Sequence, residues 1–502
     1  MGTTLEYIVT LDLGTTNIKT CVFDSALQEV CVSSGPVRYL REGNRVEFDP
    51  EKYWEACAVL IRDVVSRSGI DKSRVRSISL TGQAESLVLL DGGLRPLRMG
   101  ISWMDERSGE ECELLKGEIG PLKGYARTGL PDIVTTWPLT KILWIKRREA
   151  HVFKRARFYL LIKDFILQKL TGRLLGEHTV YNFSYYFDIA RKRYWEEALE
   201  AAGIREDQLP GLIGPGETAG TLTGDRSEEL GLPGGAVVNT GALDHFAGMI
   251  GCGNIREHQV SETTGTVLAL ATPIRKPVMD ELVKGRYRLP CHCGAGNGYV
   301  LLPVCESGGV SLDWFRDTVL PGASFSELNT EIERLSGQGS EVIFLPYLTG
   351  TNSPEFDQSA RGVWFGLRLH HTKFELAKSV MEGVTFLLKK NLAALEETGG
   401  PVEEIISLGG GSKSAVWNQM KADVTGKRII IPSKSEPTSL GAAILASIKC
   451  GWFSGVEEAV ERGVDIGRVF EPRNPERYER PYERFLELYE CLKPVFHGGR
   501  LT

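Results

Sequence analysis

The sequence lacks the features of membrane, secreted and nucleic-acid-binding proteins. Residues 1–14 contain no basic start followed by a long apolar segment, which a secretory signal requires. The longer apolar runs, such as Tyr299–Val304, are far too short to span a bilayer. The net charge of −6 comes from interspersed acidic and basic residues, so nothing favours nucleic acid or an anionic membrane as a partner. We therefore expect a cytoplasmic protein that binds neither nucleic acid nor a membrane.

The placement of the cysteines argues against a disulfide framework. The 10 cysteines are scattered over 502 residues. Cys291 and Cys293, which flank His292, form the one cluster that suggests a metal site. Their spacing is narrower than that of the paired cysteines in zinc sites. We therefore predict buried or incidental thiols here rather than metal ligands.

The two commonest nucleotide-binding motifs are also missing. The sequence has no G-x-x-x-x-G-K-[ST] loop, which argues against a P-loop NTPase. Gly409–Gly411 follows an apolar strand but lacks the spacing residues and the downstream acidic residue of a Rossmann fingerprint. Any nucleotide site must therefore use a different arrangement.

What is present is a long chain of ordinary globular composition, 42% hydrophobic and 25% charged. Predicted strands and helices alternate in both halves, which indicates two α/β domains. The alternation breaks near Gly251–Arg256, so we expect domains at 1–252 and 253–502. The expected strands include Tyr7–Leu13, Ile18–Phe23, Val75–Leu80, Glu404–Leu408 and Arg428–Pro432, and the expected helices include Leu139–Arg148, Ala156–Leu170, Phe374–Glu397, Ser414–Thr425 and Ser439–Lys449.

A candidate phosphate-binding hairpin opens the first half. Asp12 ends a strand, a tight turn with Thr15 and Thr16 follows, and Lys19 stands on the next strand. Turn N–H groups and threonine hydroxyls can donate to phosphate oxygens. Asp12 could hold Mg²⁺ through water, and Lys19 could offset phosphoryl charge. The alternative is an ordinary hairpin turn.

The second half repeats this pattern more weakly. Gly265 and Thr266 form a second turn of the same kind, and two such turns make a phosphate clamp more plausible than either alone. Gly409–Gly411 permits close approach of a ligand at the start of a helix. The small-sided helix around Gly441 could pack against a nucleotide or simply against another helix.

Polar residues after several strands are candidates for the chemistry. Asp244 ends a strand near the domain boundary and could accept a proton from a substrate hydroxyl, although most such aspartates cap a helix. Gln83, Glu85, Trp103 and Asp105 could form a sugar pocket, with Trp103 as its apolar wall. A solvated loop anchored by Trp103 is the alternative.

In their order and spacing these pieces resemble the FGGY carbohydrate kinases over nearly the whole chain. The most specific part is the C-terminal signature, which is complete. The N-terminal signature is only partly met, because Lys141 and Trp144 match while Thr136 and Arg148 do not. The C-terminal signature comprises 362–367, Glu375, Leu376 and 379–382.

The resemblance implies two ribonuclease-H-like domains of the actin/hexokinase type with an interdomain cleft, and ATP and Mg²⁺ as cofactors. Asp244 would be the general base, and Asp12 would bind the metal through water. The implied substrate-binding residues are Gln83, Glu85, Trp103, Asp105, Asp244 and His245, and the implied ATP-binding residues are Asp12, Thr15, Thr16, Lys19, Thr266, Gly410, Gly411, Ser414 and Gly441.

The substrate is less well defined by the resemblance. Gln83 and Glu85 match glycerol kinases, but Ala84 replaces their arginine, and xylulokinases have histidine where Glu85 stands. Trp103, Asp105 and Arg107 favour the xylulokinase and gluconokinase side. We expect a small sugar or polyol, with a pentulose preferred, and keep a homodimer as one option for assembly. The rival readings are a non-catalytic sugar or nucleotide sensor and a chaperone-like or filament-forming ATPase on the same scaffold.

Overall fold

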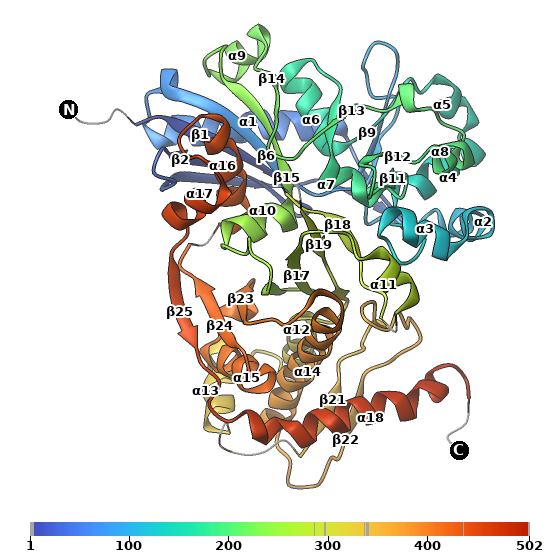
Figure 1. The fold of residues 1–502 in the computed structure, drawn as a ribbon, viewed down its shortest axis with the longest axis vertical. Helices are drawn as coiled ribbons and strands as arrows, with labels where there is room; N and C mark the ends of the chain where they lie inside the picture. The colour runs from blue at the N-terminus through green and yellow to red at the C-terminus, as the bar shows by residue number, and fades with distance from the viewer. Residues whose placement is uncertain are drawn as a thin grey trace.

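Two large mixed sheets form the two halves of the chain, and their central strands follow the same order (Figure 1). The computed structural model describes residues 5–285, 287–295, 298–335, 337, 341–434 and 436–499. In each half an antiparallel hairpin lies beside two parallel strands, so that the first strand has the second on one side and a parallel partner on the other. This duplicated order confirms the predicted actin/hexokinase-type α/β fold.

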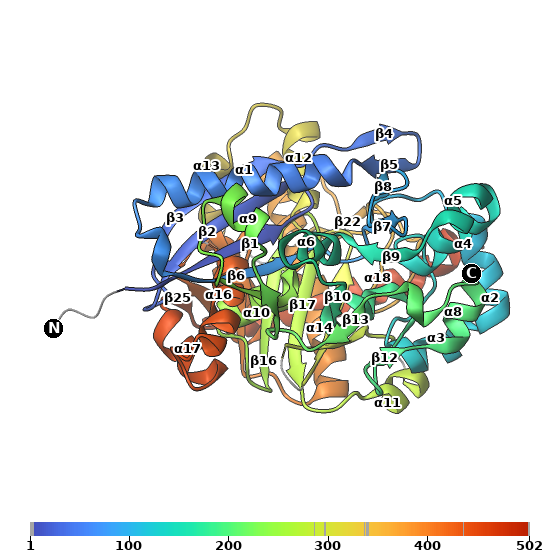
Figure 2. The same ribbon diagram turned by 90° about the horizontal axis from the view of Figure 1, so that it is seen from above.

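The first sheet has the order β14-β15-β6-β1-β2-β3. Strand β1 pairs antiparallel with β2 and parallel with β6, and β6 pairs parallel with β15. Helix α1 crosses the outer face of β2 and β3, as Figure 2 shows. The bounds are β1 Tyr7–Leu13, β2 Asn17–Asp24, β3 Glu29–Pro36, β6 Val75–Gly82, β14 Thr218–Thr221, β15 Val237–Leu243 and α1 Pro50–Ser68.

The second sheet has the order β18-β19-β17-β16-β23-β24-β25, with β20 beside β17. Strand β16 pairs antiparallel with β17 and parallel with β23, and β23 pairs parallel with β24. The bounds are β16 Gln259–Thr264, β17 Leu268–Ile274, β18 Cys291–Cys293, β19 Tyr299–Leu301, β20 Val304–Cys305, β23 Glu404–Leu408, β24 Arg428–Pro432 and β25 Ile466–Phe470.

A third sheet, β4-β5-β8-β7-β9, and several helices are inserted into the first half. Strand β9 corrects one expectation, because the predicted helix Ala156–Leu170 is a strand followed by a helix. The aromatic, apolar run Phe158–Leu161 pairs antiparallel with β7 before α6 begins. The bounds are β4 Leu40–Glu42, β5 Arg45–Phe48, β7 Leu87–Leu90, β8 Gly100–Ile101, β9 Phe158–Leu161, α2 Gly109–Ile119, α3 Pro121–Thr128, α4 Pro138–Arg148, α5 Ala150–Arg155, α6 Ile162–Thr171, α7 His178–Tyr181, α8 Glu196–Ala202 and α9 Gly224–Leu230.

The helices of the second half include α14, which is 27 residues long and largely buried. It begins with a capping box in which Thr372 and Glu375 satisfy each other's backbone N–H groups. The bounds are α11 Met279–Lys284, α12 Val310–Val319, α13 Phe325–Arg334, α14 Lys373–Gly399, α15 Ala415–Thr425, α16 Pro437–Lys449, α17 Val456–Gly463 and α18 Glu479–Phe496. Two-stranded sheets are formed by β10 Leu175–Glu177 with β13 Gly211–Ile213, β11 Phe187–Asp188 with β12 Arg193–Tyr194, and β21 Ile343–Leu345 with β22 Val363–Phe365.

Two helices join the halves. Helix α10, Asp244–Gly251, ends the first half, and α16 of the second half packs against both α10 and the first sheet. Figure 1 shows the late, red α16 beside the early, blue strands. Within the described part of the chain, no helix is long and apolar enough to cross a membrane.

Candidate active site

The carboxyl ends of three parallel strands collect predicted site residues at one edge of the first sheet. Strands β1, β6 and β15 run parallel, and their ends lead into the Gly14–Thr16 turn, Gln83–Glu85 and Asp244. Ligands of open α/β sheets bind at this edge of a sheet. The sequence predicted these residues separately, and the sheet brings them together.

The second sheet presents an equivalent edge. Strands β16, β23 and β24 run parallel, and their ends lead into the Thr266 turn, Gly409–Gly411 and Glu436. The glycines pack on β16, since a Cβ on Gly411 would lie 2.7 Å from the Thr264 Cβ. The side chains of Lys19 and Glu436 form an ion pair, which is a direct contact between residues next to the two edges.

The first phosphate-type hairpin is tight and largely accessible. A Cβ on Gly14 would lie 2.5 Å from the Asn17 carbonyl oxygen, so the turn favours glycine. The Thr15 hydroxyl accepts a 3.0 Å hydrogen bond from Trp103 Nε1, and Thr16 is exposed. This bond places the predicted sugar-pocket tryptophan directly beside the hairpin.

Asp12 has the features of a cation site. Its Oδ1 is buried and has no hydrogen-bond partner among the described residues. Burial, followed by the charge of Asp244, raises the pKa of Asp12 to about 7, while Lys19 opposes this shift. A nearby cation would satisfy this oxygen and favour the ionised carboxylate. The residue therefore fits the hydrated Mg²⁺ that the resemblance implies.

The residues after β6 include two of the residues predicted for the sugar pocket. Gln83 is buried, with its Nε2 donating to the Gly14 carbonyl at 3.3 Å and its Oε1 accepting from Ser86 at 2.7 Å. Glu85 has a φ of 61°, a left-handed conformation that is uncommon outside glycine and frequent at functional sites. Burial raises the pKa of Glu85 to about 8, which Asp244 reinforces and Lys141 opposes.

Lys141 is a site residue that the sequence reasoning did not assign. Its side chain is fully buried, and Nζ donates to the carbonyls of Thr136 at 2.7 Å and Trp103 at 3.4 Å. Burial lowers the pKa of Lys141 to about 8, against the opposing charge of Glu85. A lysine among the apolar positions of a helix was the available signal, because a buried lysine needs partners.

Asp105 is placed differently from the other pocket residues. Its carboxylate is fully buried, accepts from Val46 N at 2.6 Å and forms an ion pair with Arg107. Both oxygens are thus used within the protein, and they anchor the loop that carries Trp103. This geometry does not support direct contact between Asp105 and a substrate, so that role stays a prediction.

Asp244 is the first residue of α10, and the backbone before it is firmly held. Leu243 N donates to the Thr179 hydroxyl at 2.9 Å, and Thr179 in turn bonds to Glu177. Asp244 Oδ1 accepts from His245 N at 2.6 Å, but Leu243 holds the N-cap position of α10 and no side chain caps the helix. His245 is exposed beside Asp244, where the predicted substrate contact would need it.

The predicted nucleotide residues do not all have accessible faces. Thr266 and Gly410 are exposed at the second edge, as a ligand contact requires. Ser414 is buried, caps α15 through Trp417 N and donates to Asn329 Oδ1 at 2.7 Å.

Gly441 lies in a helix crossing. A Cβ there would stand 1.7 Å from the Ala247 carbonyl oxygen of α10. Helix packing therefore explains Gly441, and its nucleotide contact stays a prediction.

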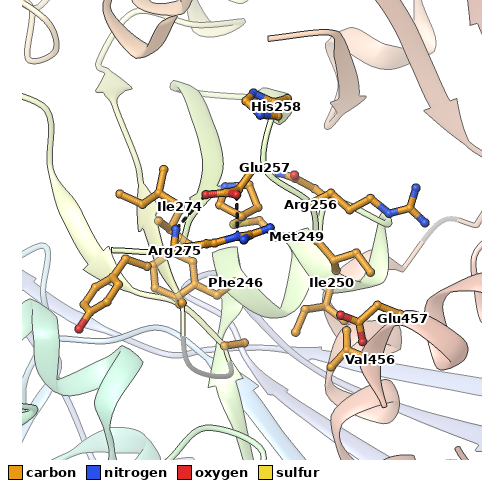
Figure 3. A pocket seen from close by; sticks show the side chains of 18 residues that line it. Phe246, Met249, Ile250, Arg256, Glu257, His258, Ile274, Arg275, Val456 and Glu457 are labelled. Carbon is orange, nitrogen blue, oxygen red and sulfur yellow. Dashed lines mark hydrogen bonds and ion pairs between the residues drawn. The ribbon is translucent and has the colours of Figure 1, made fainter. Parts of the chain in front are cut away.

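A cavity of about 660 Å³ lies elsewhere in the molecule, against the side of α10 (Figure 3). Its walls include Phe246, Met249 and Ile274, with Arg275 paired to Glu257 at the rim. It sits at the end of β16 and β17 opposite the Thr266 turn. The cavity contains none of the predicted site residues and is separate from the two strand edges.

The Cys291–Cys293 segment is structural. It forms the buried strand β18, and both thiols are free. Within the described residues, the group with metal-ligand spacing is the surface cluster Glu341, His370 and His371 instead. The prediction of buried thiols is confirmed.

Comparison with known proteins identifies the family. Residues 7–251 match the N-terminal domain and residues 261–450 the C-terminal domain of the FGGY family of carbohydrate kinases. The chain is 28% identical over 495 residues to the xylulose kinase of Bacillus subtilis (strain 168), covering 98% of both chains. It is 28% identical over 503 residues to the gluconokinase of the same organism, covering 98% of this chain and 95% of that one.

A solved structure agrees over the full length. The ligand-bound xylulose kinase from Lactobacillus acidophilus superimposes with a TM-score of 0.91 at 25% identity, covering 98% of this chain and 99% of that one. The chain belongs to the FGGY family of carbohydrate kinases, and it is a phosphotransferase that uses ATP and Mg²⁺ to phosphorylate a sugar hydroxyl.

Proposed function

We propose that this kinase phosphorylates a pentulose, with Asp244 as the general base. The observation that carries the proposal is the Lys19–Glu436 ion pair, which links the strand edge that bears Asp244 to the chain that leaves β24 at the second edge. The xylulose kinase relatives support a pentulose, and the gluconokinase relative makes gluconate the second candidate. The expected domains 1–252 and 253–502, the cytoplasmic location and the homodimer stay predictions.

In the proposed reaction each group of residues has one task. Asp244 accepts the proton of the attacking hydroxyl, which Trp103 and Glu85 help to position. The turns at Thr15, Thr16 and Thr266 donate to phosphate oxygens, and Lys19 offsets the charge that develops on the transferring group. Asp12 would hold a hydrated Mg²⁺, which would supply charge that neutralises the phosphates.

A coupled ADP-release assay with Mg²⁺-ATP tests the substrate. We expect strong turnover with one pentulose from a panel of pentuloses, hexuloses, polyols and aldonates. Preferred turnover of gluconate would instead establish the second candidate. No turnover above the sugar-free rate on the whole panel would contradict the proposal and favour a sensor.

The base assignment has its own test. Asp244→Asn should lower kcat by at least about 10³-fold, because the amide cannot accept the proton. ATP binding, measured by calorimetry, should be retained. Turnover close to that of the wild type would remove Asp244 from the base role.

A further inference from the structure

The ion pair between Lys19 and Glu436 is the most distinctive contact at the site. Lys19 stands directly opposite Asp12 in the β1–β2 ladder. Its Nζ donates to Glu436 Oε2, although the two residues are 417 positions apart. The pair therefore links the first phosphate-type hairpin to the start of α16 in the second half.

This contact differs from an ordinary surface ion pair. The side chains of Lys19 and Glu436 are only 30% and 23% exposed, so water screens their attraction less than at an open surface. Burial lowers the pKa of Lys19, but the hydrogen bond and charge of Glu436, together with the charge of Asp12, raise it overall. Glu436 thus holds an ammonium group that lies directly across the ladder from Asp12.

Glu436 forms this pair instead of a local one. It occupies the N-cap position of α16, where an acidic side chain usually accepts from the helix's own N–H groups. Its carboxylate makes no such bond within the described residues and reaches across to Lys19. The long-range contact with Lys19 thus takes the place of a capping hydrogen bond.

The helix that carries Glu436 is itself fixed in place. Ser79 of β6 donates to the Ala442 carbonyl at 2.8 Å, and Gly441 sits against the Ala247 carbonyl of α10. Helix α10 begins with Asp244. Glu436 therefore holds Lys19 at a defined place relative to the helix that carries the base.

We propose that Glu436 is a positioning residue, which aligns the Lys19 ammonium on the transferring phosphoryl group. Of the three N–H donors of a lysine, Glu436 takes one and leaves two for phosphate oxygens. A charge held in place before the reaction stabilises the transition state without reorganisation. The inference rests on the proposed function, because it assigns a partner to a residue of that site.

Glu436→Gln tests the inference by separating kcat from KM. We expect kcat to fall about 10- to 100-fold, with KM for ATP changed less than about three-fold, because the lost alignment matters in the transition state. Glu436→Asp should recover part of the loss, since its carboxylate can still pair with Lys19. An equal loss of kcat in Glu436→Asp and Glu436→Gln would overturn the role of the carboxylate.

The matched control is Glu217→Gln. Glu217 pairs with Lys449 at 3.0 Å, so it also joins the first half to α16, but at the other end of the helix. We expect its kcat to equal that of the wild type. If both glutamine variants lose kcat equally, the Lys19–Glu436 pair is a brace between the halves and not a positioning contact.

A double variant covers the case in which Glu436→Gln destabilises the fold. Lys19→Met should lower kcat, and adding Glu436→Gln should lower it no further, because the glutamate acts through the lysine. Additive losses would overturn the inference. If the wild type phosphorylates none of the sugars, the proposed function is contradicted. If Glu436→Gln has the kcat of the wild type, only the inference about Glu436 is contradicted.

Discussion

At the scale of single residues, the region beneath Asp244 is held by a chain of buried polar groups. Lys163 and Glu177 form a 2.9 Å ion pair, and both are essentially inaccessible. Glu177 accepts from Thr179, whose hydroxyl accepts from Leu243 N. Buried polar chains that are fully satisfied rigidify their surroundings. The backbone next to Asp244, the proposed base, is therefore constrained.

Thr179→Val should weaken this support. The variant keeps the shape but leaves the Leu243 N–H without its acceptor, which costs about 1–3 kcal/mol when such a group is buried. We expect a loss of that size in urea unfolding, together with a lower kcat. Thr179→Ser keeps the hydroxyl and should behave nearly like the wild type. Equal stability of the valine and serine variants would contradict the role of this bond.

Glu85 should make stability depend on pH in a defined direction. Its pKa is about 8 in the folded protein against an ordinary value of 4.5, so between these values only the folded state keeps the proton. Its contribution to stability is complete below about pH 4.5 and is lost as pH rises through about 8. Glu85→Gln removes this loss, so the variant should gain stability relative to the wild type between about pH 5 and about pH 8.5. Urea midpoints of the wild type and of Glu85→Gln at the two pH values check this. A stability difference between the two proteins that is the same at both pH values would contradict it.

At the scale of elements, the crossing of α10 and α16 decides how closely the halves approach. Gly441 lets α16 touch the Ala247 carbonyl, and Gly251 of α10 packs equally closely on Pro437. Helix α10 carries Asp244, and α16 follows Glu436. The proposed base and the proposed positioning residue are thus attached to one close helix pair.

Gly441→Ala should disrupt this crossing. Its Cβ would stand 1.7 Å from the Ala247 oxygen, so the helices must move apart. We expect a loss of about 1–3 kcal/mol or more in stability. Gly117 lies in the exposed part of α2 with nothing within 4 Å of an added Cβ. Gly117→Ala should therefore stabilise the protein by up to about 1 kcal/mol through helix propensity. A neutral effect of Gly441→Ala would show that the crossing is loose.

At the scale of the whole molecule, the two halves share structure and are not separate units. Helix α16 of the second half packs on the first sheet, and Trp452 Nε1 donates to Glu6 at 3.0 Å. The Lys19–Glu436 and Lys449–Glu217 pairs add two further links. Unfolding one half would therefore remove contacts from the other.

Thermal unfolding should consequently show one cooperative transition. Calorimetry of the full chain checks this, and two well-separated transitions would contradict it.

Mg²⁺-ATP at about 100 times its Kd should raise the unfolding free energy by about 2.7 kcal/mol, provided that only the folded state binds. The shift should shrink when Asp12→Asn replaces the carboxylate that we propose for the metal. An unchanged shift would remove Asp12 from that role.

The sequence by itself determined the fold class, the hairpins and the family. Glycine turns after strands and alternating apolar segments are local signals, so the Tyr7–Leu13 strand and the Phe374–Glu397 helix could be predicted closely. The tertiary structure decided what depends on distant partners. Lys141 is buried and donates to the Trp103 carbonyl. Asp105 is buried in an ion pair with Arg107. Glu436 pairs with Lys19, which is 417 residues away in the sequence. Pairing with β7 likewise turned the start of Ala156–Leu170 into a strand. These outcomes depend on contacts between residues that are distant in the sequence, and such contacts cannot be predicted from local sequence patterns.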